Sequence, residues 1–458
     1  MQNLILNTDS YKTSHFAQYP QGTEYISSYI ESRGGIYPST VFFGLQMFIK
    51  QYLTTPITQA DIDEADLICA AHGVPFNREG WSYILNTHQG YLPLEIEAVP
   101  EGAEVPTGNV MAQVINTDPA CAWLTSYIET ALLRAIWYPT TVATISRACH
   151  KIIAGYLNET ADDLSSLPFK LHDFGARGAS SEETVAIGGL AHLVNFMGTD
   201  SLSAIVAGRR YYGADMAGYS IPAAEHSTIT SWGRDGEADA YRNMLNQFGG
   251  KNKVVAVVSD SYNLWAAIDD LWGGKLKNQV ETMGGTLVVR PDSGNPVEVV
   301  PQAIEHLMAK FGSRTNSKGY RVLPDCVRLI QGDGVNPGSI KAILEAMKQQ
   351  GISAENVSFG MGGELLQKVH RDTQKFAMKA SAICINGNWK DIYKDPVTDH
   401  GKRSKKGRLA LTRKNGQYQT VARDSIPASA NELVTVFRNG QLITEYTFDQ
   451  VRGQVSAD

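Results

Sequence analysis

Five short apolar runs in the middle of the chain each end abruptly at a polar or glycine-rich loop. Three of these runs are continuous and rich in β-branched residues, namely Val254–Val258, Thr286–Val289 and Val327–Ile330. Short continuous runs of this kind are typical of strands buried on both faces of a parallel sheet. Stretches with helical periodicity follow the later runs, at Leu264–Trp272, Pro296–Lys310 and Ser339–Lys348. The pattern therefore predicts a series of strand-loop-helix units.

The loops that end these runs carry carboxylates, guanidinium groups and bare glycine backbone. They are Asp173–Gly178, Ser259–Ser261, Arg290–Gly294, Gln331–Gly334 and Gly360–Gly363. A series of β-loop-α units places each such loop at the carboxyl end of a strand, where α/β barrels and open α/β sheets build their sites. Five loops of this composition together predict a site for a phosphorylated ligand.

The two ends of the chain follow different patterns. Residues 1–160 mix strands and helices, with expected elements at Val41–Ile49 (leading into an amphipathic helix), Leu92–Val99 (strand) and Asp118–Trp137 (long helix). After residue 380 the chain alternates as two hairpins, whose turns contain Asn415-Gly416 and Asn439-Gly440. We therefore expect an α/β fold with an irregular α/β barrel over residues 161–380. A second, α+β domain would form where the antiparallel segment 381–458 packs with residues 1–160.

The composition limits the class of protein but does not indicate a particular chemistry. The 458 residues are 43% hydrophobic and 19% charged with a net charge of −6, which is typical of a soluble globular protein and gives no support for nucleic-acid binding. The five cysteines are scattered without a Cys-x-x-Cys pair, so neither a disulfide framework nor a thiolate zinc site is predicted. A signal-peptide pattern and a membrane-length apolar run are both absent, so we expect a cytoplasmic location and no membrane partner.

Taken singly, each loop allows a functional and a structural interpretation. Arg290 is suited to bidentate phosphate contact, and Asp292 could bind sugar hydroxyls or a hydrated Mg²⁺. Equally, Asp292 or Ser293 could cap the helix that follows. Gly360–Gly363 could form an anion nest or a tight turn, and Asp333 could contact a ribose or occupy a left-handed turn.

His226 follows a Pro-Ala-Ala loop and precedes Ser227 and Thr228, which predicts an imidazole at the start of a helix. With a carboxylate such as Asp260 to orient it, this imidazole could act as an acid, a base or a phosphate acceptor. Paired-histidine metal motifs, a Gly-x-Ser-x-Gly elbow and a nucleotide-binding P-loop are all absent from the sequence. The basic run 402–408 could be a solvated loop or could supply counter-charge to phosphates.

Long stretches in colinear order match one protein family over nearly the whole chain. They are Thr8–Lys12, Phe43–Gln46, Leu171–Gly175, Ala191–Phe196, Gly198–Asp200, Pro222–Thr230, Val258–Tyr262, Arg290–Pro296, Ile330–Gly334 and Lys402–Arg408. On these stretches the chain resembles the nicotinamide phosphoribosyltransferases of NAD salvage. The resemblance implies that nicotinamide and phosphoribosyl pyrophosphate react to give nicotinamide mononucleotide and pyrophosphate. It also implies Mg²⁺, held mainly by substrate phosphates and water, so that no metal ligands are assigned.

The resemblance further implies a role for each site residue. His226, Asp260 and Asp292 are the catalytic residues, and ATP is an optional co-substrate that phosphorylates His226 while Asp260 orients it. In a homodimer with shared active sites, Phe174 would stack on one face of the pyridine ring and Tyr11 of the partner subunit on the other. Asp200 would accept a hydrogen bond from the carboxamide. The phosphate and ribose contacts would come from Arg177, His226, Arg290, Pro291, Asp292, Gly332, Asp333, Gly362, Gly363 and Arg371. Three lysines would face the phosphates across the dimer interface: Lys379, Lys394 and Lys402.

The chain departs from the family pattern in a few places, and alternatives stay open. The segment after Arg33 is shorter and lacks a basic cluster, and the other departures are at Ala176, Ala256, Met361 and Glu364. The nearest alternative is a nicotinate or other pyridine phosphoribosyltransferase, but the carboxylate of Asp200 would repel that of nicotinate. The others are a non-catalytic binding protein on the same fold and a different barrel enzyme acting on sugar phosphates.

Overall fold

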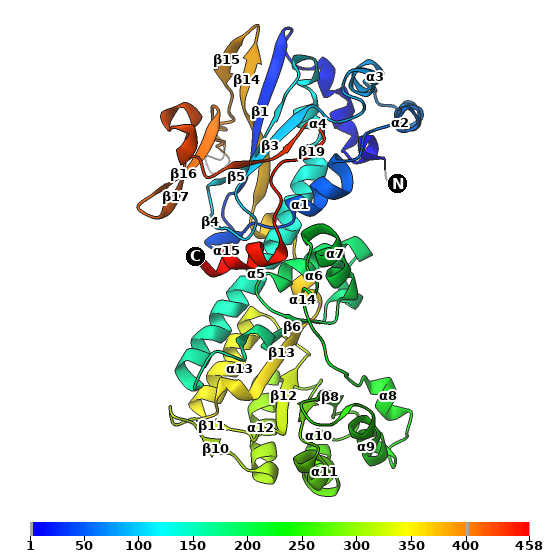
Figure 1. Cartoon of the computed structure of the whole chain (residues 1–458), viewed down its shortest axis with the longest axis vertical. Helices are drawn as coiled ribbons and strands as arrows, with labels where there is room; N and C mark the ends of the chain where they lie inside the picture. Colours follow the sequence, from blue (N-terminus) through cyan, green and yellow to red (C-terminus); the bar gives the residue numbers. More distant parts are fainter. Residues whose placement is uncertain (1–2, 399–402, 458) are drawn as a thin grey trace. The chain divides into compact units, whose positions relative to one another are not determined.

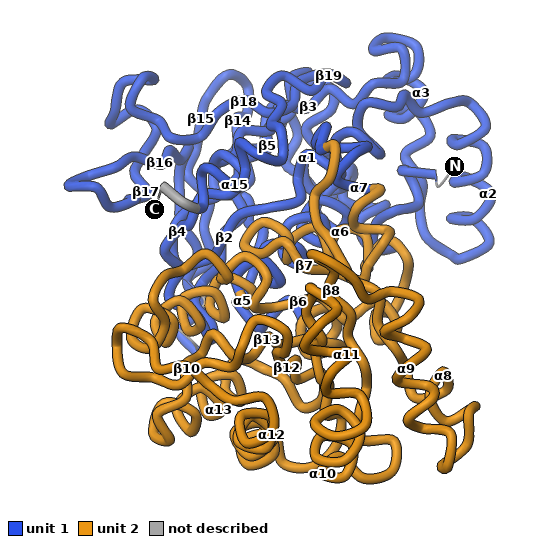
Figure 2. Tube along the Cα trace, turned by 60° about the horizontal axis from the view of Figure 1, so that its bottom comes forward, with its two compact units in different colours: residues 1–144, 207–214, 369–458 blue, residues 145–206, 215–368 orange. Residues whose placement is uncertain are grey.

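The computed structural model describes residues 3–398 and 403–457, and its contacts divide the chain into two units (Figure 2). Unit 1 comprises residues 1–144, 207–214 and 369–458, and unit 2 comprises residues 145–206 and 215–368. The domain boundaries expected near 160 and 380 stay a prediction, and the contact-defined units change at 144/145 and 368/369. Unit 1 thus combines the two ends of the chain, as the expected fold class requires.

Unit 2 is built on six parallel strands (Figure 1). In sheet order they are β7 (Gly198–Thr199), β6 (Leu171–Asp173), β13 (Val357–Met361), β12 (Val327–Gln331), β9 (Thr286–Arg290) and β8 (Val254–Val258). Every neighbouring pair is parallel. The central residues of β8, β9, β12 and β13 are buried, which confirms the interpretation of the continuous apolar runs.

An irregular segment links the two edge strands of this sheet. Tyr219 makes a parallel bridge to Gly198 of β7, and Ala223 makes one to Ala256 of β8. The strands and this segment therefore follow one another around a ring in sequence order, so the expected irregular α/β barrel is confirmed. Inside it, small and branched side chains pack together beneath Phe174: Ile221, Ala256, Val288 and Ile330.

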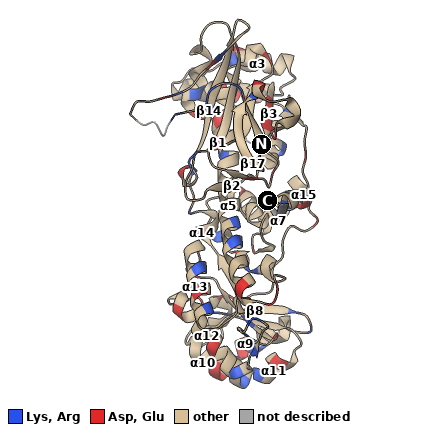
Figure 3. Cartoon of the chain, turned by 90° about the vertical axis from the view of Figure 1, so that its left-hand side faces the viewer, with Lys and Arg blue, Asp and Glu red and all other residues tan. Residues whose placement is uncertain are grey.

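Helices connect the strands of unit 2, and those that follow β9 and β12 form where the periodicity predicted them. The main ones are α6 (Glu182–Leu193), α9 (Glu237–Phe248), α12 (Pro296–Phe311) and α13 (Pro337–Gln349). The helix expected at Leu264–Trp272 forms as α10 (Leu264–Ala266) followed by a π-helical stretch, Ala267–Lys275. Acidic and basic residues are interspersed along α9, α12 and α13 rather than gathered by sign (Figure 3). No helix among the described residues is long and apolar enough to cross a membrane.

Unit 1 is built on a seven-stranded antiparallel sheet. In order, its strands are β15 (Asn388–Asp391), β14 (Phe376–Ile385), β1 (Thr23–Ser32), β5 (Val110–Asn116), β3 (Leu94–Ala98), β18 (Val434–Arg438) and β19 (Gln441–Leu442). The C-terminal strands β14 and β18 thus pair with the N-terminal strands β1 and β3. This confirms that the tail packs with the N-terminal region.

Both predicted hairpins form around their Asn-Gly turns. One is β18 with β19, and the other is β16 (Leu409–Lys414) with β17 (Gln417–Ala422). Asn415 and Asn439 have positive φ angles of 52° and 50°, which asparagine tolerates at such turns. Leu409 is tied to β5 through both of its backbone groups, which bond to the side-chain amide of Gln113.

Two predictions for the N-terminal region are wrong in detail. The helix after Val41 is fully buried over its first part, α1 (Leu45–Phe48), and has an amphipathic pattern only in its π-helical continuation Ile49–Leu53, where Ile49 and Leu53 are buried and Lys50 and Gln51 are half-buried. The helix expected at Asp118–Trp137 is interrupted and then extends far beyond Trp137, as α4 (Leu124–Tyr127) and α5 (Glu129–Thr160). Pro139 lies inside α5, and its ring packs where Gly44 has no side chain, since a Cβ on Gly44 would lie 2.4 Å from Pro139 Cγ.

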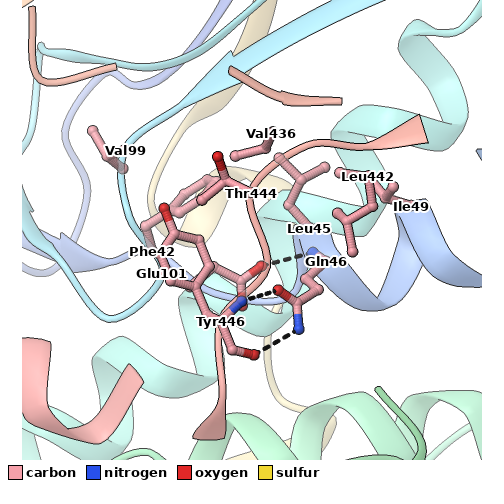
Figure 4. A pocket seen from close by; sticks show the side chains of 10 residues that line it. All are labelled: Phe42, Leu45, Gln46, Ile49, Val99, Glu101, Val436, Leu442, Thr444 and Tyr446. Atoms are coloured by element: carbon pink, nitrogen blue, oxygen red, sulfur yellow. Dashed lines mark hydrogen bonds between the residues drawn. The ribbon is translucent and has the colours of Figure 1, made fainter. Parts of the chain in front are cut away.

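The burial of α1 follows from the return of the C-terminal segment. The Gln46 side chain donates to the Tyr446 carbonyl at 2.9 Å and accepts from its amide at 2.7 Å (Figure 4). Beside it, Glu101 accepts from the Gln46 backbone amide and from the Tyr212 hydroxyl, both at 2.7 Å. Burial raises the pKa of Glu101. The cavity that these residues line measures only about 10 Å³, room for about one water molecule, so it is not a ligand site.

Candidate active site

The five predicted loops lie at the same end of the unit 2 barrel. Each follows the carboxyl end of a parallel strand: β6, β8, β9, β12 or β13. Asp200 follows β7 directly, and His226 follows the irregular segment as the first residue of α8 (His226–Thr230). The fold therefore confirms the prediction that these loops gather at one mouth of the barrel.

Phe174 covers the centre of this mouth. Its backbone amide donates to the Met361 carbonyl at 2.9 Å, which ties the loop after β6 to β13. The ring lies against two glycines, because a Cβ on Gly360 would come within 2.0 Å of Phe174 Cε2 and one on Gly332 within 3.5 Å. The ring is half-buried, so one part packs on the barrel interior and another part is open to a ligand.

Asp173, the first carboxylate of these loops, does not face the mouth. Its side chain is fully buried and accepts hydrogen bonds from Ser201 Oγ at 2.6 Å, the Gly175 amide at 2.7 Å and Thr199 Oγ1 at 3.3 Å. Burial raises the pKa of Asp173, and these hydrogen bonds oppose the shift. Its role is to hold the loop in place, so one of the acidic groups that suggested a ligand site is structural.

Asp200 is exposed at the rim, where Ser220 fixes one of its oxygens. The Ser220 hydroxyl donates to Asp200 Oδ1 at 2.5 Å, and the Asp200 amide donates to the Asp173 carbonyl at 3.0 Å. One carboxylate oxygen is therefore engaged by a hydroxyl, and the remaining acceptor capacity of the group is available to a hydrogen-bond donor such as an amide.

His226 is in contact with two carboxylates. Its Nε2 lies 3.1 Å from Asp260 Oδ1, and its Nδ1 lies 3.9 Å from Asp292 Oδ2. The Asp260 side chain is only 4% exposed, whereas that of His226 is 45% exposed. The second oxygen of Asp260 accepts from the Asp292 amide at 3.0 Å and from the Ser293 hydroxyl. An accessible imidazole is thus oriented by a nearly buried carboxylate.

Arg290 presents a cation beside this pair. Its Nη2 lies 3.7 Å from Asp292 Oδ2, and its Nε is buried without a hydrogen-bond partner among the described residues. The suggestion that Asp292 or Ser293 caps the next helix is wrong, because the N-cap of α12 is Asn295, whose side chain accepts from the Val297 amide. The side chains of Arg290 and Asp292 are therefore free of a capping role.

The remaining glycine loops supply backbone close to the same mouth. In Gln331–Gly334 the residue with positive φ is Gly334, at 66°, so the suggested left-handed turn at Asp333 is wrong and the Asp333 side chain is exposed. After β13, Gly363 starts the short helix α14 (Gly363–Leu366), and a Cβ there would meet nothing within 4 Å. Arg177 is exposed on the loop after β6.

Four other predicted site residues belong to unit 1. Tyr11 is 59% exposed, Arg371 and Lys394 are exposed, and Lys379 lies on β14. Burial lowers the pKa of Lys379, and neighbouring cations act in the same direction. The fifth, Lys402, lies outside the described residues.

Part of the basic run 402–408 is held by contacts within unit 1. Lys405 forms an ion pair with the buried carboxylate of Glu31, and Arg408 lies 5.2 Å over the ring of Trp389. These two members of the run are therefore not simply solvated.

The mouth carries oxygen ligands suited to a magnesium ion, but the described residues form no dedicated metal cage there. Asp292 and Asp333 are carboxylates with exposed or partly exposed oxygens, which suits Mg²⁺ coordinated through water and ligand phosphates. Among the described residues, His88, Asp118 and Cys121 of unit 1 also lie close together. That group is satisfied internally, because Asp118 accepts from Tyr83, His88 and the Ala120 amide.

Two residues with clear contacts at the mouth did not emerge from the sequence: Ser220 and Ser293. Ser220 engages Asp200, and Ser293 engages Asp260. The signal for Ser293 was its place directly after Asp292 in a strand-end loop. Ser220 carried no signal, because the segment that contains it has no strand-like pattern.

Comparison with known proteins gives matches over the whole chain. Residues 169–441 match the nicotinate phosphoribosyltransferase (NAPRTase) family, and residues 3–96 match the nicotinamide phosphoribosyltransferase N-terminal domain. A nicotinamide phosphoribosyltransferase from Xanthomonas campestris pv. campestris is 54% identical over 464 residues, covering 100% of this chain and 99% of the relative. Another, from Acinetobacter baylyi, is 32% identical and covers 98% of this chain and 96% of the relative.

Solved structures share the fold at low sequence identity. A nicotinate-nucleotide pyrophosphorylase from Pyrococcus furiosus superimposes with a TM-score of 0.62 at 15% identity, over 99% of this chain and 95% of that one. The human nicotinic acid phosphoribosyltransferase gives 0.55 at 16% identity, over 98% and 93%. These likenesses agree with the barrel and the antiparallel sheet described above.

Proposed function

The chain belongs to the nicotinamide phosphoribosyltransferase family, and on that premise we propose that it transfers the phosphoribosyl group of phosphoribosyl pyrophosphate to nicotinamide. The products are nicotinamide mononucleotide and pyrophosphate, a step of NAD salvage. The observation that carries the proposal is the meeting of Phe174, Asp200 and Arg290 with the His226–Asp260 pair at one barrel mouth.

Phe174 and Asp200 bind and orient the nicotinamide. The pyridine ring stacks on the open part of the Phe174 ring, and Tyr11 of the partner subunit covers its other face. The carboxamide NH₂ donates to Asp200, whose other oxygen is engaged by Ser220. Holding the neutral ring nitrogen in line with the anomeric carbon lowers the entropic barrier to its attack.

The cations and glycine loops bind the second substrate. Arg290 and Arg177 bind the pyrophosphate, and the glycine loops with Arg371 bind the ribose phosphate through close backbone contact. Pro291 is buried and fixes the backbone between Arg290 and Asp292. As the glycosidic bond breaks, negative charge grows on the pyrophosphate, where guanidinium groups stabilise it. Asp292 and Asp333 would hold a bound Mg²⁺ through water, and that ion would supply further neutralisation of the phosphates.

We propose that ATP acts through His226. The imidazole is accessible and oriented by Asp260, as a phosphate acceptor requires. Its phosphorylation adds negative charge close to Arg290 and couples ATP hydrolysis to mononucleotide formation. His226→Ala should abolish stimulation by ATP and weaken transfer. Unchanged stimulation in that variant would refute the phosphohistidine role.

We also propose a homodimer whose sites are shared. Lys379, Lys394 and Lys402 would approach the phosphates bound in the partner subunit. Mixing Tyr11→Ala protein with Asp200→Ala protein tests this, because mixed dimers regain one intact site. Activity that stays at the level of the separate variants would contradict sharing.

Substrate preference decides between nicotinamide and nicotinate. The proposal expects a higher kcat/KM for nicotinamide than for nicotinate, with Mg²⁺ and with or without ATP. Asp200 is the physical reason, since it accepts from an amide and repels a carboxylate. A higher kcat/KM for nicotinate would assign the chain to the alternative activity, and no mononucleotide from either would favour a binding protein.

A further inference from the structure

Asp260 is shared between two elements of the barrel mouth. Its Oδ1 lies 3.1 Å from His226 Nε2, at the start of α8. Its Oδ2 accepts from the Asp292 amide at 3.0 Å and from the Ser293 hydroxyl, both on the loop after β9. Only 4% of the Asp260 side chain is exposed, so water has little access to replace a hydrogen bond that this carboxylate loses.

Ser293 has no other structural duty that would explain this contact. It is exposed and does not cap α12, a role that belongs to Asn295. Gly294, with φ of 87°, turns the chain immediately after it. An exposed hydroxyl would otherwise bond to water, but here it makes a charge-assisted hydrogen bond to a nearly buried carboxylate.

The loop that holds Ser293 also carries the cation of the site. Arg290 and Asp292 lie at its start, and Asp292 approaches the second nitrogen of His226 at 3.9 Å. A phosphate bound at Arg290 therefore acts on the same short loop that engages Asp260 twice. A small displacement of this loop therefore changes the position of the His226 imidazole through the Asp260 carboxylate.

We propose that Ser293 is a positioning residue that links occupancy of the Arg290 loop to the orientation of His226 through Asp260. The inference rests on the proposed function, because it explains how ATP use at His226 is tied to the bound pyrophosphate group. Without the hydroxyl, Asp260 keeps its backbone bond to Asp292 but holds the loop less firmly. Transfer itself should then be less affected than its coupling to ATP.

Ser293→Ala tests the link, with Ser293→Thr as the variant that keeps the hydroxyl. Ser227→Ala is the matched control, because Ser227 is an exposed hydroxyl beside His226 whose partner is Glu225 rather than Asp260. We expect Ser293→Ala to raise the ATP hydrolysed per mononucleotide formed by about tenfold, the scale of one charge-assisted hydrogen bond. Ser293→Thr and Ser227→Ala should stay near the wild-type ratio. A wild-type ratio in Ser293→Ala, or an equal rise in Ser293→Thr, overturns the inference.

A second measurement does not depend on catalysis. In substrate-free protein carrying ¹⁵N-labelled histidine, the His226 resonance is identified by its loss in His226→Ala. Inorganic pyrophosphate should shift this resonance in the wild-type chain and in Ser227→Ala, and should shift it much less in Ser293→Ala. An equal shift in Ser293→Ala, or no response in the wild-type chain, overturns the link even where transfer is normal. Conversely, the expected shifts without mononucleotide formation would retain the link and reject the proposed reaction.

Discussion

Replacing Gly360 by alanine asks whether the position of the Phe174 ring controls nicotinamide binding. Gly360 lies in β13, and an added Cβ would sit 2.0 Å from Cε2 and 2.1 Å from Cδ2 of Phe174. Ordinary contacts start at 3.4 Å. The distance from the added Cβ to Cε2 is therefore about 1.4 Å too short, and in a close-packed interior the Phe174 ring has to move by about that amount.

The kinetic cost follows from what the ring does. Stacking of two aromatic rings contributes about 0.5–1.5 kcal/mol beyond area burial, and a misplacement of about 1 Å near the reacting atoms costs up to about a hundredfold in rate. We expect Gly360→Ala to raise the KM for nicotinamide about tenfold and to lower kcat/KM by about ten- to a hundredfold. The KM for phosphoribosyl pyrophosphate should change by less than about threefold, because the atoms that the added methyl meets belong to the Phe174 ring and not to Arg290 or Gly363.

A double-mutant cycle with Phe174→Ala provides the decisive assay. If the added methyl acts by displacing the ring, it should cost little once the ring is gone, so the two effects are strongly non-additive. Gly285→Ala serves as a steric control, since its Cβ would lie 2.4 Å from the carbonyls of Gly250 and Lys253. It should lower Tm without a selective rise in the KM for nicotinamide. An undiminished kinetic loss from Gly360→Ala in the Phe174→Ala background would refute the reasoning.

Three further outcomes are expected. Asp200→Asn should raise the nicotinate-to-nicotinamide ratio of kcat/KM by about tenfold or more, because a charge repulsion is removed; an unchanged ratio contradicts the role of Asp200. Burial holds the pKa of Lys170 at about 7, against 10.5 in the unfolded chain, so the unfolded state binds more protons between these values. The free energy of unfolding should therefore rise with pH across this window by up to about 1.4 kcal/mol per unit, a slope that urea titrations should not find in Lys170→Met. Tyr212→Phe should cost about 1–3 kcal/mol of stability, because buried Glu101 loses a donor, and chemical denaturation measures that loss.

The sequence predicted best those features that depend on local patterns. Continuous apolar runs became the parallel strands β8, β9 and β12, and the Asn-Gly pairs became the turns of both hairpins. Parallel strands in sequence order then placed the five loops at one mouth. These inferences needed only periodicity, turn chemistry and the direction of the strands.

Features that depend on distant residues could not be predicted in this way. Asp173 is the last residue of β6 and Asp260 comes just after β8, yet Asp173 turns into the fold to meet Ser201 while Asp260 meets His226. The direction of a side chain at a strand end depends on neighbours far along the chain. Likewise, the ring of Pro139 inside α5 packs where Gly44, from another element, has no side chain.

The strands of the two sheets come from different parts of the sequence, and this has a consequence for biosynthesis. The strands of unit 2 all lie within residues 171–361, so its barrel is complete before the C-terminal segment leaves the ribosome. In unit 1, β1, β5 and β3 are made first, but their outer neighbours β14 and β18 are made last. Ser32 donates to the Gln374 carbonyl across 342 positions of sequence. Two edges of the N-terminal sheet therefore wait unpaired through most of translation, the period when nascent chains are most exposed to edge-to-edge aggregation.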